Sequence, residues 1–323
     1  MSNLKLIVAG LSILLGGANS AVAEWPEKQI TLVVPFAAGG TNDTLSRVIG
    51  ENLAKTLGKP VIIENDPGAA GTTPTSRVAK SSPDGYTLLM GNMGTHAVAP
   101  VQYPNLKYDP TRDFTPIGLA GEVPAVLVAR KDFPANTLAE FVDYVRKNQD
   151  KVNEAHVGAG SPTHTFCTLL QSLMGTKTAR VAYRGGAQAM SDLVGGQVDF
   201  SCISLSGAIS QIHGGTVKAI AIASAERADV IKDVPTAKEG GMPEFQVSTW
   251  NALFAPRGLP KDVQSKLNGA LVAALEAKEV RTRLLELGIA IPEKADRTPE
   301  ALQKLVDSEV RRWATVLAQK TTK

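Results

Sequence analysis

The chain has 323 residues, of which 43% are hydrophobic and 20% are charged, and its formal net charge is +3. This is the composition of a globular protein with enough residues for two domains. The small net charge argues against a nucleic-acid partner, which would need a clustered basic face. No segment after residue 23 is long and apolar enough to span a membrane.

The first 23 residues have the pattern of a secretory signal peptide. Lys5 supplies the positive start, Leu6–Leu15 form an apolar core too short to span a bilayer comfortably, and Ala21–Ala23 form a small-residue cleavage site. We expect cleavage after Ala23 and export of the mature chain; an uncleaved anchor is the alternative. Cleavage removes one lysine and no acid, so the formal charge falls from +3 to +2.

Residues 30–47 predict a strand, a turn and a helix. The apolar run Ile30–Val34 forms the strand, Pro35 ends it, Ala37–Gly40 form a turn with almost no side-chain bulk, and one of the residues Thr41–Asp43 caps the helix. Such a junction aims backbone N–H groups at one point, which attracts an anion. There is no dinucleotide fingerprint and no P-loop, and an ordinary strand-to-helix turn is the alternative.

The same alternation continues through the first hundred residues. Residues 60–65 form a second strand, a small-residue loop and a short helix follow, and Tyr86–Met90 form a third strand that ends in the loop 91–96. This alternation predicts a parallel α/β sheet, and the loops at its carboxyl edge predict a ligand crevice.

Two long extended segments, residues 114–130 and 245–255, have the length to cross between domains. Between them the strand, loop and helix pattern repeats, and after them two helical patterns return to the first domain. We therefore predict lobe 1 from residues 24–120 with 251–323 and lobe 2 from residues 121–250, a hinged clamp of the kind that closes around small ligands. The expected elements after the first crossing are helices at 137–147, 187–194, 261–277 and 298–319, and strands at 155–158, 179–183, 198–203 and 219–223. A further helix is expected to follow the loop 158–164 and to end at Met174.

Enzyme and metal chemistry find little support. No pair of the four histidines has HxH or HxxxH spacing, the two cysteines lack zinc-site spacing, and no GxSxG elbow is present. A Ser–His–Asp hydrolase would need a nucleophile with a neighbouring base. Ser161 and His164 are three residues apart, and no hydrolase motif surrounds them. Cys167 and Cys202 would be exported, so pairing is allowed, and two free buried thiols are the alternative.

Seven motifs occur in order along the chain: VVPFAAGGTND, ENDPGAAGT, SPDGYTLL, GAGSPTH, VAYRGG, LVGGQVDF and DVPTAKEGG. With them, the chain from about Trp25 to its C-terminus resembles the Bug family, the periplasmic solute-binding proteins of tripartite tricarboxylate transporters. The resemblance implies a two-lobed periplasmic binding protein fold, type II-like, with two Rossmann-like domains joined by two crossing segments. It implies a small organic acid as ligand, membrane permease subunits as partners, and no cofactor, metal or catalytic residue.

The resemblance also suggests the residues of the site. The first loop is the expected carboxylate cradle, with Asp43 as helix cap or loop brace. His156 is a donor into the cleft or an ordinary strand histidine, and Arg184 grips a carboxylate or braces its loop. The expected ligand-binding residues are Phe36, Ala38, Gly39, Gly40, Thr41, Asn42, Asp43, Asn92, Thr95, His156, Gly158, Ser161, His164, Arg184, Gly185 and Ser204.

The cysteines and the strand end after them carry two further implications. Some relatives have cysteine at both positions, which favours a Cys167–Cys202 disulfide. Related sequences often follow the second cysteine with Asp, whereas this chain has Ile203 and Ser204, so a polar contact of lobe 2 is lost or is replaced by Ser204 or Ser206. We expect a periplasmic protein that captures a small carboxylate or dicarboxylate; a receptor that presents its ligand to a signalling protein and, less favoured, a periplasmic hydrolase are the alternatives.

Overall fold

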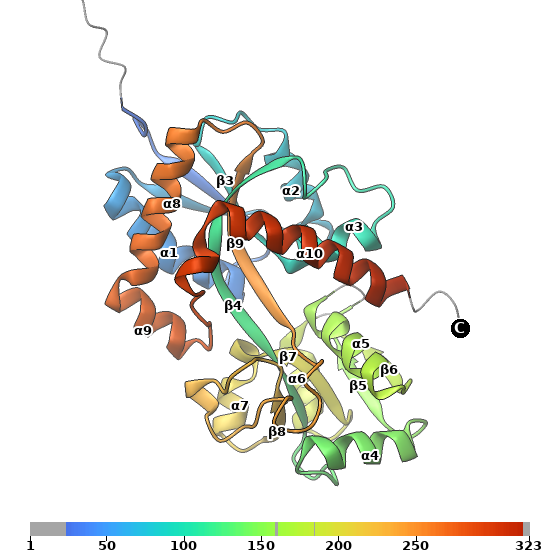
Figure 1. Ribbon diagram of the computed structural model, residues 1–323. Coiled ribbons are helices and arrows are strands. Elements are labelled where there is room, and N and C mark those ends of the chain that lie inside the picture. The colour runs from blue at the N-terminus through green and yellow to red at the C-terminus, as the bar shows by residue number, and fades with distance from the viewer. Residues whose placement is uncertain (1–23, 159–160, 184, 319–323) are drawn as a thin grey trace, which may run out of the picture.

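The computed structural model describes residues 24–158, 161–183 and 185–318. The expected signal peptide and Arg184 lie outside the described residues. Two bodies of α/β structure lie one above the other, and two long strands run between them (Figure 1). We call the body that contains β1–β3 the first lobe and the body that contains β5–β8 the second lobe. The predicted two-lobed α/β fold is confirmed.

The first lobe is built on three parallel strands. β1 (Ile30–Val34) pairs with β2 (Val61–Asn65) on one side and with β3 (Thr87–Asn92) on the other. The connecting helices are α1 (Thr41–Leu57) and α2 (Thr72–Ala79). Leu45, Ile49 and Leu53 of α1 are fully buried, because residues four apart lie on one face of a helix.

The two crossing segments are strands in one continuous sheet. β4 (Phe114–Arg130) pairs with β9 (Ser248–Pro256) as far as Pro124, and from Ala125 onward it pairs with β7. β4 leads into the second lobe and β9 leads back, so both pair antiparallel with their neighbours. The prediction of parallel pairing is confirmed for β1, β2 and β3 in the first lobe and for β5, β6 and β7 in the second. The strand order is β2-β1-β3-β9-β4-β7-β5-β6, with β8 also on β4.

The second lobe repeats the parallel core. β5 (Asn153–His156) pairs in parallel with β6 (Ala179–Ala182) and β7 (Phe200–Ser204). Thr137 caps the first helix as predicted, and Glu140 returns the bond in a capping box. The remaining elements are α4 (Leu138–Asn148), α5 (Pro162–Met174), α6 (Gly186–Val194), α7 (Ile209–His213) and β8 (Val217–Ile222).

A disulfide joins α5 to β7 through Cys167 and Cys202. Both cysteines are fully buried. The pairing favoured by the family resemblance is therefore present, and it ties the helix that follows the glycine loop to the neighbouring strand.

The C-terminal helices return to the first lobe. α8 (Lys261–Glu276) lies beside α1 and buries Leu267, Ala270 and Leu271, and α10 (Pro299–Ala318) lies along β4 (Figure 1). The sequence patterns did not predict α9 (Lys278–Glu286), which the extended residue Ala277 separates from α8. They also missed the short helix α3 (Ala99–Gln102).

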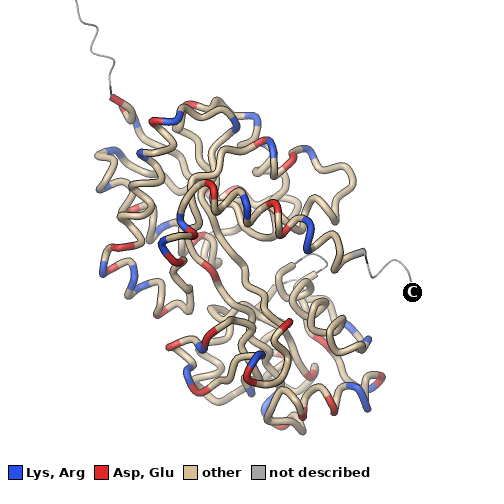
Figure 2. Tube along the Cα trace, in the orientation of Figure 1, with Lys and Arg blue, Asp and Glu red and all other residues tan. Residues whose placement is uncertain are grey.

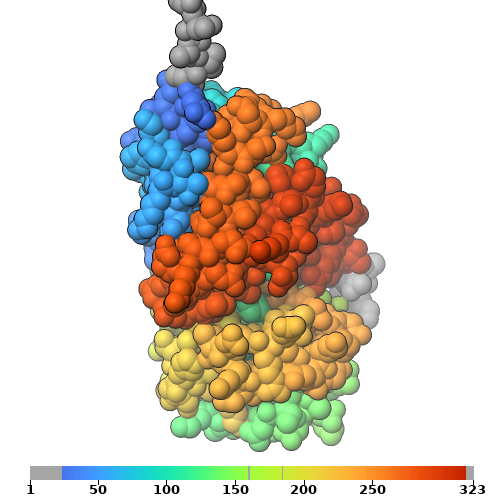
Figure 3. All heavy atoms as spheres, turned by 60° about the vertical axis from the view of Figure 1, so that its left-hand side comes forward, coloured from blue at the N-terminus to red at the C-terminus, as the bar shows by residue number. Residues whose placement is uncertain are grey.

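The lobes touch on the side of α9. A Cβ built at Gly288, just after α9, would lie 2.9 Å from the Ile209 side chain and 3.0 Å from that of Leu205, both in the second lobe. Figure 3 shows the C-terminal helices directly above the second lobe on this face. This contact needs a residue without a side chain at Gly288.

Charge is spread over both lobes. Figure 2 shows basic and acidic residues intermingled on the outer helices, with few along the crossing strands. Within residues 24–158, 161–183 and 185–318, no helix combines the length and the apolarity that crossing a membrane requires.

Candidate functional site

The loop between β1 and α1 has little side-chain bulk at its tip. Ala37–Gly40 are exposed, and α1 begins at Thr41 with Gly40 as the N-cap residue and no side-chain cap. The prediction that one of the residues Thr41–Asp43 caps the helix is therefore wrong, because these are its first three helical residues. The N–H groups of this first turn carry the partial positive charge of the helix end.

Asp43 braces the loop. Its Oδ2 accepts a hydrogen bond from the Gly39 N–H at 2.8 Å and another from Arg47 Nε at 3.1 Å, and its Oδ1 accepts one from Asn65 Nδ2 at 3.0 Å. Burial by itself would raise the pKa of this carboxyl, but the hydrogen bonds from Arg47, Gly39 and Asn65 hold the pKa below its ordinary value. Asp43 thus carries a negative charge that its partners compensate, which agrees with the brace expected from the sequence.

The first turn of α1 also holds the crossing strand and the second lobe. Asn42 Nδ2 donates to Asn251 Oδ1 of β9 at 2.9 Å, and Thr41 Oγ1 lies 2.8 Å from Ser206 Oγ of the second lobe. Asn251 was not predicted, whereas Ser206 was one of the two serines expected to replace the missing Asp contact of lobe 2. Ser204, which was predicted, ends β7 two residues before Ser206 and is half-buried.

Three loops of the first lobe converge. A Cβ built at Gly71 would lie 2.9 Å from Thr95 Cγ2 and 3.2 Å from the ring of Phe36. In the second loop Ala69 and Ala70 have φ of 46° and 54°, the left-handed region that non-glycine residues avoid. Two strained alanines beside the point where the loops converge are typical of a functional loop. The amino-acid sequence of this loop gave no sign of the strain.

The third loop has a different structure from the one predicted. β3 continues through Asn92, and a π-helical turn, Gly94–Val98, follows directly. The Asn92 N–H donates to Thr95 Oγ1, and the Thr95 N–H donates to Asn92 Oδ1, both at 3.1 Å. Thr95 has no exposed surface and Asn92 is 6% exposed. In this structure the pair holds the strand end, and a direct ligand contact from either residue stays a prediction.

His96, the next residue, is fully buried and stacks on Phe254 with 4.0 Å between ring centroids. Burial lowers the pKa of His96 to about 3. An imidazole whose pKa falls on folding stabilises the protein fully above its unfolded pKa of about 6.5, and this contribution is lost as pH falls towards the folded value.

We therefore expect acidification from pH 7 to pH 5 to remove about 2 kcal/mol of unfolding free energy through His96 alone. Urea unfolding at both pH values measures this loss, and His96→Gln should lack that part of it. The exposed His213 offers the matched control His213→Gln. An identical pH dependence in wild type and His96→Gln would contradict the assignment.

The second lobe presents the end of β5 and the start of α5. His156 ends β5 and is 7% exposed, and the Gly158 N–H donates to His156 Nδ1 at 3.1 Å. Ser161 is the N-cap of α5, where its Oγ donates to the Gly158 carbonyl at 2.7 Å and accepts from the His164 N–H at 3.3 Å. Gly185 is the N-cap residue of α6.

The carboxyl edges of the two lobes face each other. β7 runs into Ser206, which touches Thr41 of the first lobe, and β5 and β6 run parallel with β7. Because parallel strands end at the same edge of a sheet, His156 lies at the edge that meets the first-lobe loop. Among the predicted site residues that the structure describes, those of the first lobe therefore lie at one edge, and those of the second lobe lie at the edge opposite.

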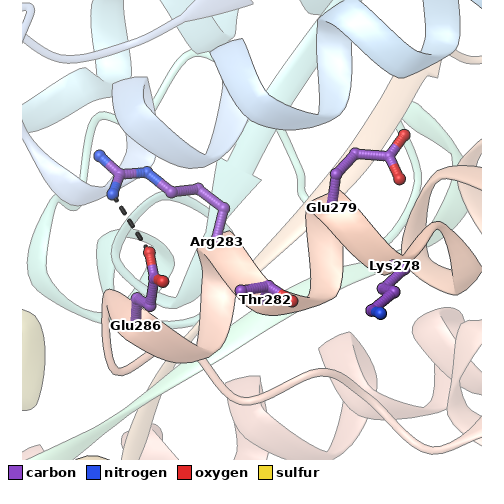
Figure 4. Close-up of a pocket in the computed structure, with 5 residues that line it drawn as sticks. All are labelled: Lys278, Glu279, Thr282, Arg283 and Glu286. Atoms are coloured by element: carbon purple, nitrogen blue, oxygen red, sulfur yellow. Dashed lines mark hydrogen bonds and ion pairs between the residues drawn. The ribbon is translucent and has the colours of Figure 1, made fainter.

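The hollow drawn in Figure 4 lies elsewhere. It measures about 490 Å³, and every residue that lines it belongs to α9, including the ion pair between Arg283 and Glu286 at 3.4 Å. A single helix provides no second wall to enclose a ligand, so this hollow is not a candidate site. Among the residues that the structure describes, no three His, Cys, Asp or Glu side chains are grouped in a way that could hold a metal ion.

Comparison with known proteins identifies relatives along nearly the whole chain. The family model "Tripartite tricarboxylate transporter family receptor" matches residues 45–321. A protein of Agrobacterium vitis from the TAR-I ttuE-ttuC' intergenic region is 38% identical over 99% of this chain and 92% of its own length. Protein BugT of Bordetella pertussis is 32% identical over 97% of this chain and 96% of its own length.

Solved structures show the same architecture. MatC of Rhodopseudomonas palustris, with bound malate, is 46% identical with a TM-score of 0.80 and covers 90% of this chain and 99% of its own. Rpa4515 of R. palustris, with adipate, is 32% identical with a TM-score of 0.81 and covers 91% of this chain and 97% of its own. Both of these similar proteins are dicarboxylate complexes.

Proposed function

Because this chain belongs to the family of tripartite tricarboxylate transporter receptors, we propose that it captures a small dicarboxylate between its lobes and delivers it to a membrane permease. The family consists of extracytoplasmic solute-binding proteins rather than enzymes. The proposal places the exported chain in the periplasm, with a signal peptide of residues 1–23. It assigns residues 24–120 and 251–323 to one lobe, residues 121–250 to the other, and no reaction to the site.

The observation that carries the proposal is the helix end of α1. Its first turn has no side-chain cap, the loop before it ends in Gly39 and Gly40, and the edge of the second lobe stands opposite. A ligand carboxylate at this point would accept hydrogen bonds from several backbone N–H groups at once. The malate and adipate bound by MatC and Rpa4515 have the chemistry that such a cradle accepts.

The expected strength of binding follows from the number of donors. One exposed helix end contributes only about 0.3–1 kcal/mol, so useful affinity requires several amides in a cleft that closes and excludes water. The opposite lobe supplies the contacts to the second carboxylate. The residues proposed for this end are those around His156, Ser161, His164, Arg184 and Ser204.

A thermal-shift screen tests the proposal. Malate, succinate, adipate and citrate are compared with acetate and with malamide, the uncharged diamide of malate. A ligand at 100 times its dissociation constant adds about 2.7 kcal/mol of stability, which raises Tm by roughly 4–5 °C for a chain of this length. We expect at least one dicarboxylate to do so and malamide to have no effect.

The absence of a shift with every acid at millimolar concentration would contradict the proposal. Recovery of the bound acid unchanged after long incubation would agree with a binding protein, whereas conversion would point to the hydrolase alternative. Loss of uptake of the same acid in a deletion strain separates transport from presentation to a signalling protein.

A further inference from the structure

Two histidines meet at the edge of the second lobe that faces the first. His156 is the last residue of β5 and His164 lies in the first turn of α5, and their ring centroids are 5.1 Å apart. His156 is buried and His164 is half-buried. Each ring has one nitrogen within hydrogen-bond distance of a group that can only donate.

The hydrogen bonds determine which nitrogen carries the proton in each ring. Arg180 Nη1 lies 3.2 Å from His164 Nε2, and because a guanidinium has only donors, Nε2 accepts. A neutral imidazole has one donor and one acceptor nitrogen, so His164 carries its proton on Nδ1. The Gly158 N–H donates to His156 Nδ1, so His156 carries its proton on Nε2.

A buried carboxylate holds the arginine in place. Glu154 of β5 has no exposed surface, and its Oε2 lies 3.4 Å from Arg180 Nε and also accepts from Gln171 Nε2. Gln171 is itself fixed, because its Oε1 accepts from the Thr178 N–H at 3.0 Å. The chain of contacts from Glu154 through Arg180 to His164 thus runs from the interior of the lobe to the edge that faces the first lobe.

We propose that Arg180, held by Glu154, is a positioning residue that keeps His164 in the Nδ1–H tautomer, and that the histidine pair offers the ligand neutral N–H donors. The second part rests on the proposed function. Neutral donors bind a carboxylate or a hydroxyl without adding charge to the cleft. Neither Glu154 nor Arg180 is among the residues expected to touch the ligand, and their role is to orient the ring that does.

The tautomer is measured without any ligand. Long-range ¹H–¹⁵N NMR of the ¹⁵N-labelled protein at pH 8 distinguishes protonated from unprotonated ring nitrogens, and single His→Gln variants assign the four histidines. We expect Nδ1–H for His164 and Nε2–H for His156. The double variant Glu154→Gln/Arg180→Met, which removes both charges together and leaves no buried carboxylate unpaired, should shift His164 to Nε2–H and leave His156 unchanged.

A matched control lies in the same lobe. Arg146 donates from Nε to the Met174 carbonyl at 3.0 Å, at the opposite end of α5 from His164, so Arg146→Met should leave both tautomers unchanged. Arg180→Lys keeps a cation beside Glu154 and serves as the conservative variant if the double variant does not fold. Nε2–H for His164 in the wild-type protein would overturn the proposal.

Isothermal titration with malate tests the ligand part. The double variant should bind malate on the order of tenfold more weakly, the effect of one misplaced hydrogen bond, and Arg146→Met should bind as the wild type does. A changed tautomer with unchanged malate affinity would refute the donor role. If the wild-type protein bound none of the screened acids, the proposed function and the donor role would fail together, while the NMR result would still decide the tautomer.

Discussion

Gly40→Val is expected to weaken malate binding by about 100-fold or more while the protein stays folded. A charge-assisted hydrogen bond contributes about 1.5–3 kcal/mol, and a factor of ten in affinity is 1.4 kcal/mol, so losing two such bonds is sufficient. A Cβ at Gly40 would meet only the Ala37 carbonyl oxygen, at 3.7 Å, so the added side chain would occupy open space in front of the helix end.

The backbone conformation at Gly40 allows a side chain, so the substitution tests binding alone. Gly40 has φ of −80° and ψ of 169°, a conformation that any residue adopts, so valine adds no backbone strain. Gly39→Val should also lose binding, but φ at Gly39 is 86°, and a side chain there costs about 1–2 kcal/mol in addition. Gly40→Val therefore separates blocked binding from damaged folding.

Calorimetric titration with malate measures the effect, and circular dichroism with a melting curve confirms the fold. Gly269→Val on the exposed face of α8, where a new Cβ also meets nothing within 4 Å, is the matched control. Unchanged affinity in Gly40→Val would show that the carboxylate does not sit against this loop.

The second large effect is expected from the disulfide. Cys167→Ala/Cys202→Ala should lower the unfolding free energy by about 4 kcal/mol, because the bond closes a loop of 35 residues and restricts the unfolded chain. Alanine is the suitable replacement, since serine would place hydroxyl groups in a fully buried site.

Urea unfolding without reductant compares the double variant with the wild type, and the wild type unfolded in dithiothreitol should show a similar loss. The loss should fall mainly on the second lobe, because the bond joins α5 to β7. A difference below about 1 kcal/mol would mean that the unfolded chain is restricted by other means.

Features that depend on neighbouring residues were predictable from the sequence. The β1 strand, the small-residue turn and α1 follow one another along the chain, and Thr137 with Glu140 caps α4 within a single turn. The crossing strands were also recognisable, since a buried strand as long as β4 leaves a long apolar pattern. The family resemblance then assigned the ligand class, which local patterns alone do not.

In the exceptions, contacts that the sequence pattern does not show decide the conformation. Asp43 was a good candidate for a helix cap, but the Gly39 N–H, Arg47 and Asn65 draw its carboxylate back over the loop. The left-handed alanines Ala69 and Ala70 are held by the surrounding structure, because their own preference is for negative φ.

The sequence by itself therefore determined two α/β lobes, two crossings and a small-residue loop that leads into a helix, because each depends on periodicity and on neighbouring residues. Only the tertiary structure decided what stands around that helix end. Thr41 meets Ser206 and Asn42 meets Asn251 across 165 and 209 residues of chain, and Arg180 sets the proton on His164 from a different element. Hydrogen bonds over such separations exist only once the lobes are packed, so no local pattern contains them.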